Sequence, residues 1–223
     1  MRYIIGDTET TGLGPDRAAC EIGLIEIDPD TLDVLGEMSS IINPGKPIDP
    51  KAFAVHGITD ERASGFPTLP TYIADTLGGP LDGDLCLIGY RVSFDLPMLR
   101  PFGNIVKTFD VLTLAQSLVT DSVDHKLQTM KEHFNLAGGA AHSALGDCQT
   151  TLELLCILIS MSGRTLRAHC ATEFTMIHTM PWGKHSGSPL VALPASYRKW
   201  LIGLADLDHN LRKSLEILSK TER

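Results

Sequence analysis

Two carboxylates stand two residues apart at the end of a short apolar run near the start of the chain. The stretch RYIIGDTET carries Asp7 and Glu9, and the chain then breaks at Gly12, Gly14 and Pro15. If this stretch is a β-strand, its period of two points both carboxylates to one side of the sheet. Such close carboxylates repel each other unless a cation neutralises them, and oxygen-rich clusters suit Mg²⁺ or Mn²⁺. The pair alone also fits a solvated strand end, so a metal site requires further acids.

Two later stretches supply such acids. In IGYRVSFDLPML, Asp95 follows a strand and a turn at the start of a helix, where an acid also complements the helix dipole. In AHSALGDCQTTLELL, Asp147 lies in the second turn of a predicted helix, five residues after His142. Five residues turn about 140° around a helix, so the two side chains cannot share a face of one helix. His142 is therefore placed in a mobile loop that approaches the helix, although a single histidine at such a position also fits an ordinary surface residue.

The elements that must position these residues are predicted from periodicity and turn signals. Strands are predicted over 2–10, 20–28, 33–43, 84–90 and 105–112. The first three form an antiparallel meander, and a Pro-rich loop over 43–68 follows them. Helices are predicted over 69–78, 93–102, 113–119, 126–135 and 143–161, with Ser143 as the N-cap of the last and Gly163 just beyond it. Strands followed by alternating helices and strands predict an α/β or α+β layer fold.

The tail differs from the rest of the chain in charge. A connector with some helical potential over 163–181 leads to short strands or turns over 181–194 and an amphipathic region over 197–218. Residues 181–223 hold 7 Lys and Arg against 4 Asp and Glu, whereas residues 1–180 hold 12 against 23. Aromatic and basic side chains lie together in the tail, at Trp182, Lys184, Tyr197, Arg198, Lys199 and Trp200. This mixture suits single-stranded nucleic acid, and a small core with basic edges explains it equally well.

Composition excludes several classes of protein. The 223 residues are 43% hydrophobic and 21% charged, as in ordinary globular proteins, and the net charge of −8 argues against a general nucleic-acid coat. No apolar run long enough to span a bilayer and no signal peptide are recognised, so a soluble, cytoplasmic protein without a membrane partner is expected. Five scattered cysteines without a Cys-x-x-Cys pair predict reduced thiols rather than structural zinc.

Three motifs carry a resemblance to a known family. In order, DTETTGL, SFDLPML and HSALGDCQTT resemble the three exonuclease motifs of the DnaQ-like, DEDDh 3′–5′ exonucleases, and NPGKPIDPKAFAVHGIT resembles the segment that joins the first two. The tail resembles the small C-terminal module of one member of that family. The resemblance implies an α/β fold, namely a ribonuclease-H-like mixed sheet flanked by helices, with a small C-terminal module. It also implies an exonuclease domain over 1–165, a connector over 166–180 and the module over 181–223.

The same resemblance implies the catalytic residues. Asp7, Glu9, Asp95 and Asp147 would hold two Mg²⁺ ions, with Mn²⁺ as a substitute, and Asp95 would act through water. Two ions roughly 4 Å apart can activate a water and stabilise the leaving 3′-oxygen of a phosphodiester. His142 would be the general base, because imidazole accepts a proton near neutral pH.

Further residues are expected to contact the substrate. Thr8 and Thr10 flank the first acids. Leu13 would touch the terminal base by resemblance, with plain packing as the alternative. Phe94 is expected to be a core residue that supports Asp95. The family often has HNxSFD where this chain has YRVSFD, so Arg91 either binds a phosphate or is a surface residue.

The sequence therefore predicts a metal-dependent 3′–5′ exonuclease that releases nucleoside 5′-monophosphates from DNA 3′ ends, in DNA repair or end trimming. Alternatives on the same fold are a polymerase proofreading subunit and an RNA-trimming enzyme, because the motifs specify the reaction better than the sugar. A catalytically inactive nucleic-acid-binding domain is disfavoured by the complete set of four acids and a histidine. The oligomeric state stays open, with a homodimer among the options.

Overall fold

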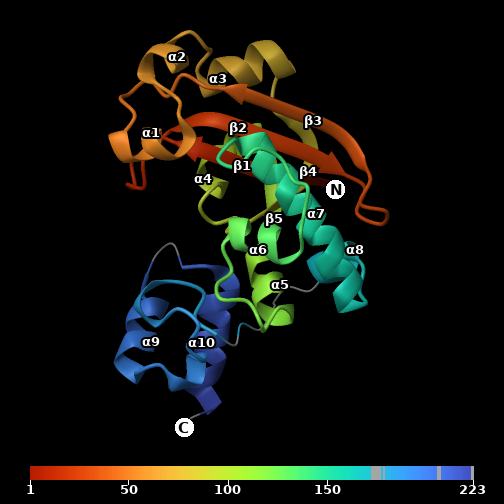
Figure 1. Cartoon of the computed structure of the whole chain (residues 1–223), viewed down its shortest axis with the longest axis vertical. Coiled ribbons are helices and arrows are strands. Elements are labelled where there is room, and N and C mark those ends of the chain that lie inside the picture. Colours follow the sequence, from red (N-terminus) through yellow and green to blue (C-terminus); the bar gives the residue numbers. More distant parts are fainter. Residues whose placement is uncertain (172–176, 178, 205–206, 222–223) are drawn as a thin grey trace.

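The computed structural model describes residues 1–171, 177, 179–204 and 207–221, and its centre is a mixed five-stranded sheet (Figure 1). The strands are β1 (Arg2–Thr10), β2 (Ala19–Ile27), β3 (Val34–Ile41), β4 (Leu81–Gly89) and β5 (Gly103–Asp110). Their order is β3-β2-β1-β4-β5. The first three form the antiparallel meander that the turn signals predict, and β4 and β5 run parallel to β1. This mixed sheet confirms the predicted fold class.

Helices and short helical turns connect and flank the strands. The α-helices are α1 (Pro50–His56), α2 (Asp60–Ser64), α3 (Leu69–Thr71), α4 (Leu96–Leu99), α5 (Val111–Leu118), α6 (Leu127–His133), α7 (Ala144–Ser162), α8 (Leu166–Ala171), α9 (Ala195–Ile202) and α10 (His209–Thr221). A π-helical turn continues α3 over Tyr72–Thr76, and 3₁₀ turns lie at Arg100–Phe102, Gly183–His185 and Leu190–Ala192. Ser143 caps α7 and Gly163 ends it in the left-handed conformation, as predicted.

The alternation along the strands produces a core on each face of the sheet. On one face, Tyr3 and Ile5 of β1 pack with buried residues of α5, α6, α7 and α8. On the other face, Ile4 packs with the π-helical turn, α4 and the 3₁₀ turn after it. Asp7 and Glu9 continue the odd-numbered series, so β1 directs them to the face that α7 covers.

Three predicted segments are refined by the structure. The Pro-rich stretch over 43–68 is not only a loop, because Asp49 and Thr59 cap the short helices α1 and α2 within it. In the tail, the stretch over 181–194 forms the turns that were one of the two expected options: it contains two 3₁₀ turns, and one isolated bridge joins Thr179 to Pro189. The amphipathic region over 197–218 divides into α9 and α10. Its middle, at 205–206, and the connector residues 172–176 and 178 lie outside the described residues.

One helix bears on the expectation that no apolar stretch spans a bilayer. By length and composition alone, α7 could cross a bilayer. In the structure α7 is a central helix of the fold: Cys148, Leu154, Leu155 and Leu158 are buried in the core beneath the sheet. A buried core helix passes the same test of length and composition.

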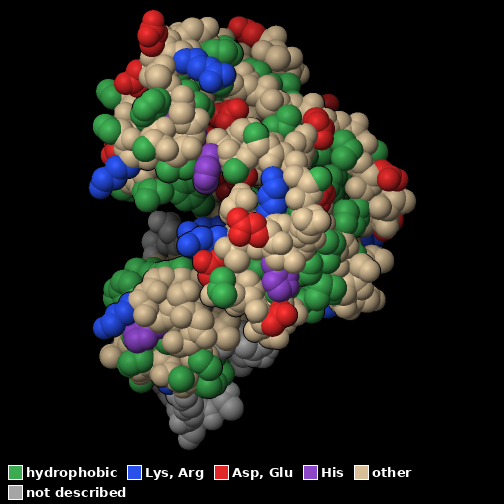
Figure 2. Space-filling model, in the orientation of Figure 1, with side chains coloured by type: hydrophobic (Ala, Val, Ile, Leu, Met, Phe, Trp, Pro, Cys, Tyr) green, Lys and Arg blue, Asp and Glu red, His purple; other side chains and the backbone are tan. Residues whose placement is uncertain are grey.

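The C-terminal module has a hydrophobic cluster of its own. Its buried members include Met180, Leu190, Leu201, Leu211 and Leu215. The module lies beyond α5 and α6 at one end of the molecule (Figure 1), and the space-filling view is hollowed between it and the sheet domain (Figure 2). The exact domain limits stay a prediction.

Candidate active site

The strand β2 and the start of helix α7 approach each other closely beside the first motif. Gly23 of β2 is paired with Asp7 in the antiparallel register. A Cβ atom at Gly23 would lie 2.4 Å from the backbone nitrogen of Leu145. The start of α7 therefore rests directly on the backbone of β2, which only glycine permits. This contact brings the third motif against the end of the first.

The N-terminal turn of α7 presents the third motif to the strand. Asp147 lies in the first turn of α7, slightly earlier than predicted, and the nearby backbone N–H of His142 lowers the pKa of its carboxyl. His142 is exposed and stands in the loop before the helix with φ of 59°, a left-handed conformation that is uncommon outside glycine. The predicted loop position of His142 is therefore confirmed.

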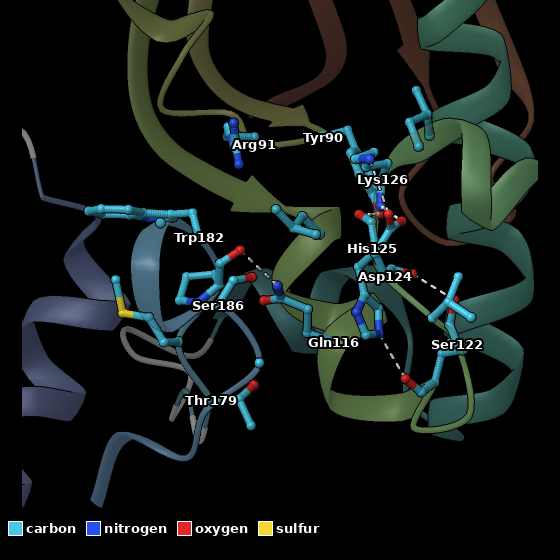
Figure 3. Close-up of a pocket in the computed structure, with 18 of the residues that line it drawn as sticks. Tyr90, Arg91, Gln116, Ser122, Asp124, His125, Lys126, Thr179, Trp182 and Ser186 are labelled. Atoms are coloured by element: carbon cyan, nitrogen blue, oxygen red, sulfur yellow. Dashed lines mark hydrogen bonds and ion pairs between the residues drawn. The ribbon is translucent and has the colours of Figure 1, made fainter. Parts of the chain in front are cut away.

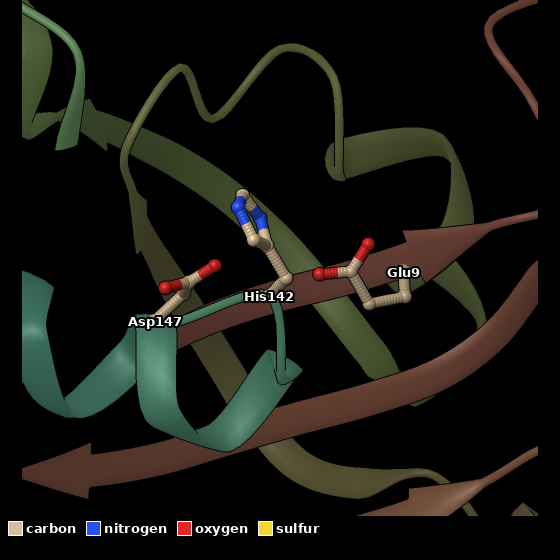
Figure 4. Close-up of side chains that lie close together, drawn as sticks. All are labelled: Glu9, His142 and Asp147. Carbon is tan, nitrogen blue, oxygen red and sulfur yellow. The ribbon is translucent and has the colours of Figure 1, made fainter. Parts of the chain in front are cut away.

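Glu9, His142 and Asp147 form a compact cluster of potential ligands. One ligand atom from each side chain lies within 4.8 Å of the others (Figure 4). Burial raises the pKa of Glu9 to about 8, and repulsion from Asp147 and Glu21 adds to the rise. Burial also raises the pKa of Asp147, although the neighbouring His142 opposes this. Glu9 comes from β1, whereas His142 and Asp147 come from α7 and the loop before it, 133 residues or more further along the chain.

Asp7 and Asp95 join this cluster electrostatically. Burial raises the pKa of Asp7 well above its ordinary value, and the charges of Asp95, Asp147 and Glu9 raise it further. Asp95 precedes α4 and is almost fully buried; one of its carboxylate oxygens accepts both the backbone N–H of Thr8 (2.9 Å) and the Thr8 hydroxyl (2.7 Å). Burial raises the pKa of Asp95 to about 7, although these two hydrogen bonds lower it.

The donor set fits divalent cations. Four mutually repelling carboxylates and one imidazole converge near the end of the central strand β1, and oxygen-rich clusters of this kind suit hard cations. Bound positive charge would remove the repulsion that raises these pKa values.

Two residues near the cluster, Glu21 and His56, were not predicted from the sequence as part of the site. Glu21 stands opposite Glu9 in the β1–β2 register, and its carboxylate accepts the backbone N–H of Ala144 at 3.1 Å, at the start of α7. His56, in the HGIT turn, accepts the backbone N–H of Ile58 at Nδ1, so Nε2 carries the proton and donates to the carbonyl of Thr10 at 3.3 Å. Strand register would have been the signal for Glu21. For His56, the HGIT turn marks the position in the sequence, but nothing in the sequence predicts its hydrogen bond to Thr10.

The residues expected to contact substrate take different positions. Thr8 and Thr10 are buried, and their hydroxyls donate to Asp95 and to the carbonyl of Gly12 at 2.8 Å, so they support the site from within. Leu13 is 86% exposed beyond the end of β1.

The second motif also departs from expectation at Phe94. This residue is half-buried rather than a core residue, and the guanidinium of Arg17 lies 4.3 Å from its ring centroid. Arg91 is exposed at the turn after β4.

Comparisons with known proteins agree with this geometry. The model of the exonuclease family RNase_T matches residues 4–155, which contain all five predicted catalytic residues. Exodeoxyribonuclease 10 of Escherichia coli K12 is 27% identical over 221 residues, covering 94% of this chain and 95% of that protein. A DNA polymerase III subunit epsilon-like protein of Rhodobacter capsulatus is 28% identical over 190 residues, covering 80% of this chain and 26% of that protein.

Among solved structures, Exonuclease X in complex with 5′ overhanging duplex DNA is similar, with a TM-score of 0.60 and 24% identity over 75% of this chain and 97% of that chain. The shared fold is the mixed sheet with its flanking helices. Exonucleases of this family depend on divalent metal ions, which agrees with the carboxylate cluster. The chain belongs to the exonuclease family and is a nuclease of that family, with its acidic cluster near the end of the central strand of a ribonuclease-H-like sheet.

Proposed function

We propose that this exonuclease removes nucleotides from the 3′ ends of DNA, that it releases nucleoside 5′-monophosphates, and that it serves DNA repair or end trimming. The observation that carries the proposal is the approach of Glu9, His142 and Asp147 to within 4.8 Å of one another, beside the mutually repelling carboxylates of Asp7 and Asp95. A nucleic-acid-binding domain without catalysis needs no such cluster of repelling acids.

The carboxylates are proposed to hold two Mg²⁺ ions, with Mn²⁺ as a substitute. When bound, these ions supply charge neutralisation at the scissile phosphate and at the leaving 3′-oxygen. Asp7, Glu9 and Asp147 would provide direct ligands, since they share the face between β1 and α7. Asp95 would act through water, because Thr8 already occupies one of its carboxylate oxygens.

His142 is proposed to take a proton from the attacking water. Its side chain is exposed, and its loop stands at the rim of the cluster rather than inside the helix. A ligand atom of its imidazole lies within 4.8 Å of carboxylate oxygens of Glu9 and Asp147, so the base stands beside the proposed metal ligands and within reach of a water bound there.

DNA is the proposed substrate because Exonuclease X was solved with duplex DNA and because the name of Exodeoxyribonuclease 10 specifies DNA. Leu13, exposed at the end of β1, would contact the terminal base pair and help to separate it. A proofreading subunit is the second candidate, since one relative is named for a DNA polymerase III subunit, of which this chain spans 26%. We also propose a cytoplasmic location, where a DNA-repair nuclease of this kind would meet its substrate.

The decisive experiment is digestion of oligonucleotides labelled at either end, with Mg²⁺, Mn²⁺ or EDTA. Shortening of 5′-labelled DNA one nucleotide at a time, with nucleoside 5′-monophosphate as product and no reaction in EDTA, is the expected result. Matched RNA strands test the sugar, and DNA with a mismatched 3′ end tests proofreading.

The Asp147→Asn protein, purified in parallel, controls for contaminating nucleases. Shortening from the 5′ end would overturn the proposed direction. Faster digestion of RNA than of DNA would favour the RNA-trimming alternative. Selective removal of a mismatched end would favour proofreading.

A further inference from the structure

A cavity of about 890 Å³ lies between the sheet domain and the C-terminal module. One wall comes from the turn after β4, from α5 and from the segment over 119–127, and the other from the segment over 179–187 (Figure 3). This volume is in the range of cavities that bind ligands of the size of one or two nucleotides. The cavity is distinct from the carboxylate cluster, because none of the acids proposed as metal ligands lines it.

Arg91 places a cation on the sheet-domain wall. Its φ of 66° is left-handed, and its backbone N–H donates to the buried carboxylate of Asp110 at 3.0 Å, which holds the turn in place. Within the described ranges, the exposed guanidinium has no ion pair or side-chain hydrogen bond. Arg91 and Asp95 belong to the same connection between β4 and α4, four residues apart.

Trp182 places an aromatic ring on the module wall. It is half-buried and packs against the hydrophobic cluster of the module, so its position is supported from behind. In Figure 3, Arg91 and Trp182 come from opposite walls, and the Arg91 side chain extends toward the space above the indole ring.

Polar groups between these walls are suited to a ligand with hydrogen-bond donors. The Gln116 side chain extends from α5, and its Nε2 donates to the carbonyl of Pro181 at 3.5 Å. Its Oε1 is buried and has no hydrogen-bond partner in the described part of the chain. Lys126 and Asp124 also line the cavity and form an ion pair of 3.2 Å, so this acid is already neutralised and Arg91 leaves the wall net positive.

We propose that this cavity binds a single-stranded segment of the DNA strand that is being degraded, with a phosphate on Arg91 and a base stacked on Trp182. A guanidinium recognises phosphate through charge-assisted hydrogen bonds, and indole rings stack on bases of any sequence. This inference rests on the proposed function, because it takes the DNA strand from the exonuclease reaction.

The chain contains two tryptophans, Trp182 and Trp200, which allows a direct optical test. The Trp200→Phe protein keeps Trp182 as its single tryptophan, and stacking of a base on the indole should quench its fluorescence. Titration with a thymidine oligonucleotide of about ten residues, in EDTA at low salt, should therefore quench most of this emission. In the matched Trp182→Phe protein, Trp200 lies 53% exposed on α9 outside the cavity, and its emission should change little.

Arg91→Asn, made in the Trp200→Phe background, tests the phosphate contact. Asparagine tolerates the left-handed backbone at this position and removes the charge. The Kd from the quenching titration should rise about tenfold, and the slope of log K against log salt should fall by about 0.7, as for one lost phosphate contact. Arg100→Asn is the matched control, because Arg100 is also exposed but lies at the opposite end of β4. The Kd of the Arg100→Asn protein for the oligonucleotide should stay unchanged.

Absence of Trp182 quenching at saturating DNA, or equal Kd values for the Arg91→Asn and Arg100→Asn proteins, would overturn the inference. Melting curves of each variant verify folding. Hydrolysis of the nitrophenyl ester of thymidine 5′-monophosphate by the wild-type protein with Mg²⁺ tests the proposed function separately, because this ester is too short to reach both sites. Lack of that hydrolysis with quenching intact would reject the proposed function and retain the DNA contact.

Discussion

At the level of single residues, the carboxylates of the site oppose the folded state when no cation is present. Each of Asp7, Glu9, Asp95 and Asp147 has its pKa raised by burial, and the charges of the neighbouring acids raise it further for Asp7 and Glu9. A fold that keeps such a cluster needs another source of stabilisation for it, and metal binding is that source in the proposed function.

This repulsion leads to a prediction for Glu9→Gln and Asp147→Asn. In EDTA at pH 9, above the Glu9 pKa of about 8, both proteins should melt at the wild-type temperature or above it, because each change then removes one charge from a buried like-charged cluster. Added Mg²⁺ should raise the Tm of the wild-type protein and raise that of the variants much less. Hydrolysis of DNA should fall on the order of 10³-fold, which corresponds to several kcal/mol of lost charge stabilisation.

Glu37→Gln, an exposed change on β3, is the control and should keep both the Mg²⁺ response and the activity. Near-normal turnover in the Glu9→Gln protein would contradict the assignment of this acid as a metal ligand.

His142 has a separate prediction, because its backbone conformation limits the useful substitutions. His142→Asn keeps a residue that tolerates the left-handed φ and removes the base, whereas alanine would also strain the loop. Turnover should fall roughly a hundredfold or more, the range of a lost general base, with a much smaller change in DNA affinity. Single-turnover kinetics and binding in EDTA separate the two effects. A full rate with an unchanged pH profile would exclude His142 as the base.

At the level of elements, sequence patterns identified the strands and the order of the motifs but not how the elements meet. Alternation and turn residues predicted β1, β2 and β3, and the cap signals predicted α7 to within one residue at either end. The register between β1 and β2 was not readable, so Glu21 was missed. The helices α1 and α2 are five to seven residues long, too short to produce a periodic pattern, and only their caps distinguish them from loop.

The close approach of α7 to β2 predicts the effect of Gly23→Ala. A Cβ atom there would meet backbone atoms of Ala144 and Leu145 at 2.4 to 2.6 Å, so the start of α7 must move. The change should lower stability by about 1–3 kcal/mol, as overpacking does, and should lower activity further by displacing Asp147. Gly36→Ala on β3 is the matched control, since nothing lies within 4 Å of its Cβ position. Denaturant unfolding and DNA digestion measure both effects, and equal results for the two variants would contradict this role of Gly23.

The turn between β4 and α4 depends on Asp110, which also caps α5. Burial raises the pKa of Asp110 to about 7, although the backbone N–H of Arg91 lowers it. A raised carboxyl pKa favours the protonated folded state, so the stability linked to Asp110 is present below pH 4 and is lost as the pH rises to about 7.

Between pH 4.5 and pH 7.5 the free energy of unfolding should therefore fall less for the Asp110→Asn protein than for the wild-type protein. The difference should be on the order of a few kcal/mol, and it should appear as a smaller decrease in Tm. The measurement is made in EDTA, so the acids of the active site contribute equally to both proteins. Parallel curves for the two proteins would show that Asp110 is ionised throughout this range.

At the level of the whole molecule, an acidic exonuclease domain carries a basic module. Residues 1–180 have a balance of −11 and residues 181–223 a balance of +3. The module packs around its own hydrophobic cluster, whereas α8 still belongs to the core beneath the sheet through Leu166 and Cys170. A polyanion that approaches the acidic domain would gain most from the module at low salt, where exposed charges are least screened.

Truncation after Ala171 tests whether the exonuclease domain carries catalysis and the module strengthens DNA binding. The shortened protein keeps α8 and every predicted catalytic residue, so it should fold and hydrolyse DNA with a kcat close to that of the full chain. Its KM should rise about tenfold or more at low salt and converge with that of the full chain as salt increases, because the lost contacts are phosphate contacts. Unchanged KM and salt slope in a soluble truncated protein would remove the module from DNA binding. Aggregation would show instead that the module covers an apolar face of the exonuclease domain, as its cavity wall and the Gln116–Pro181 contact permit.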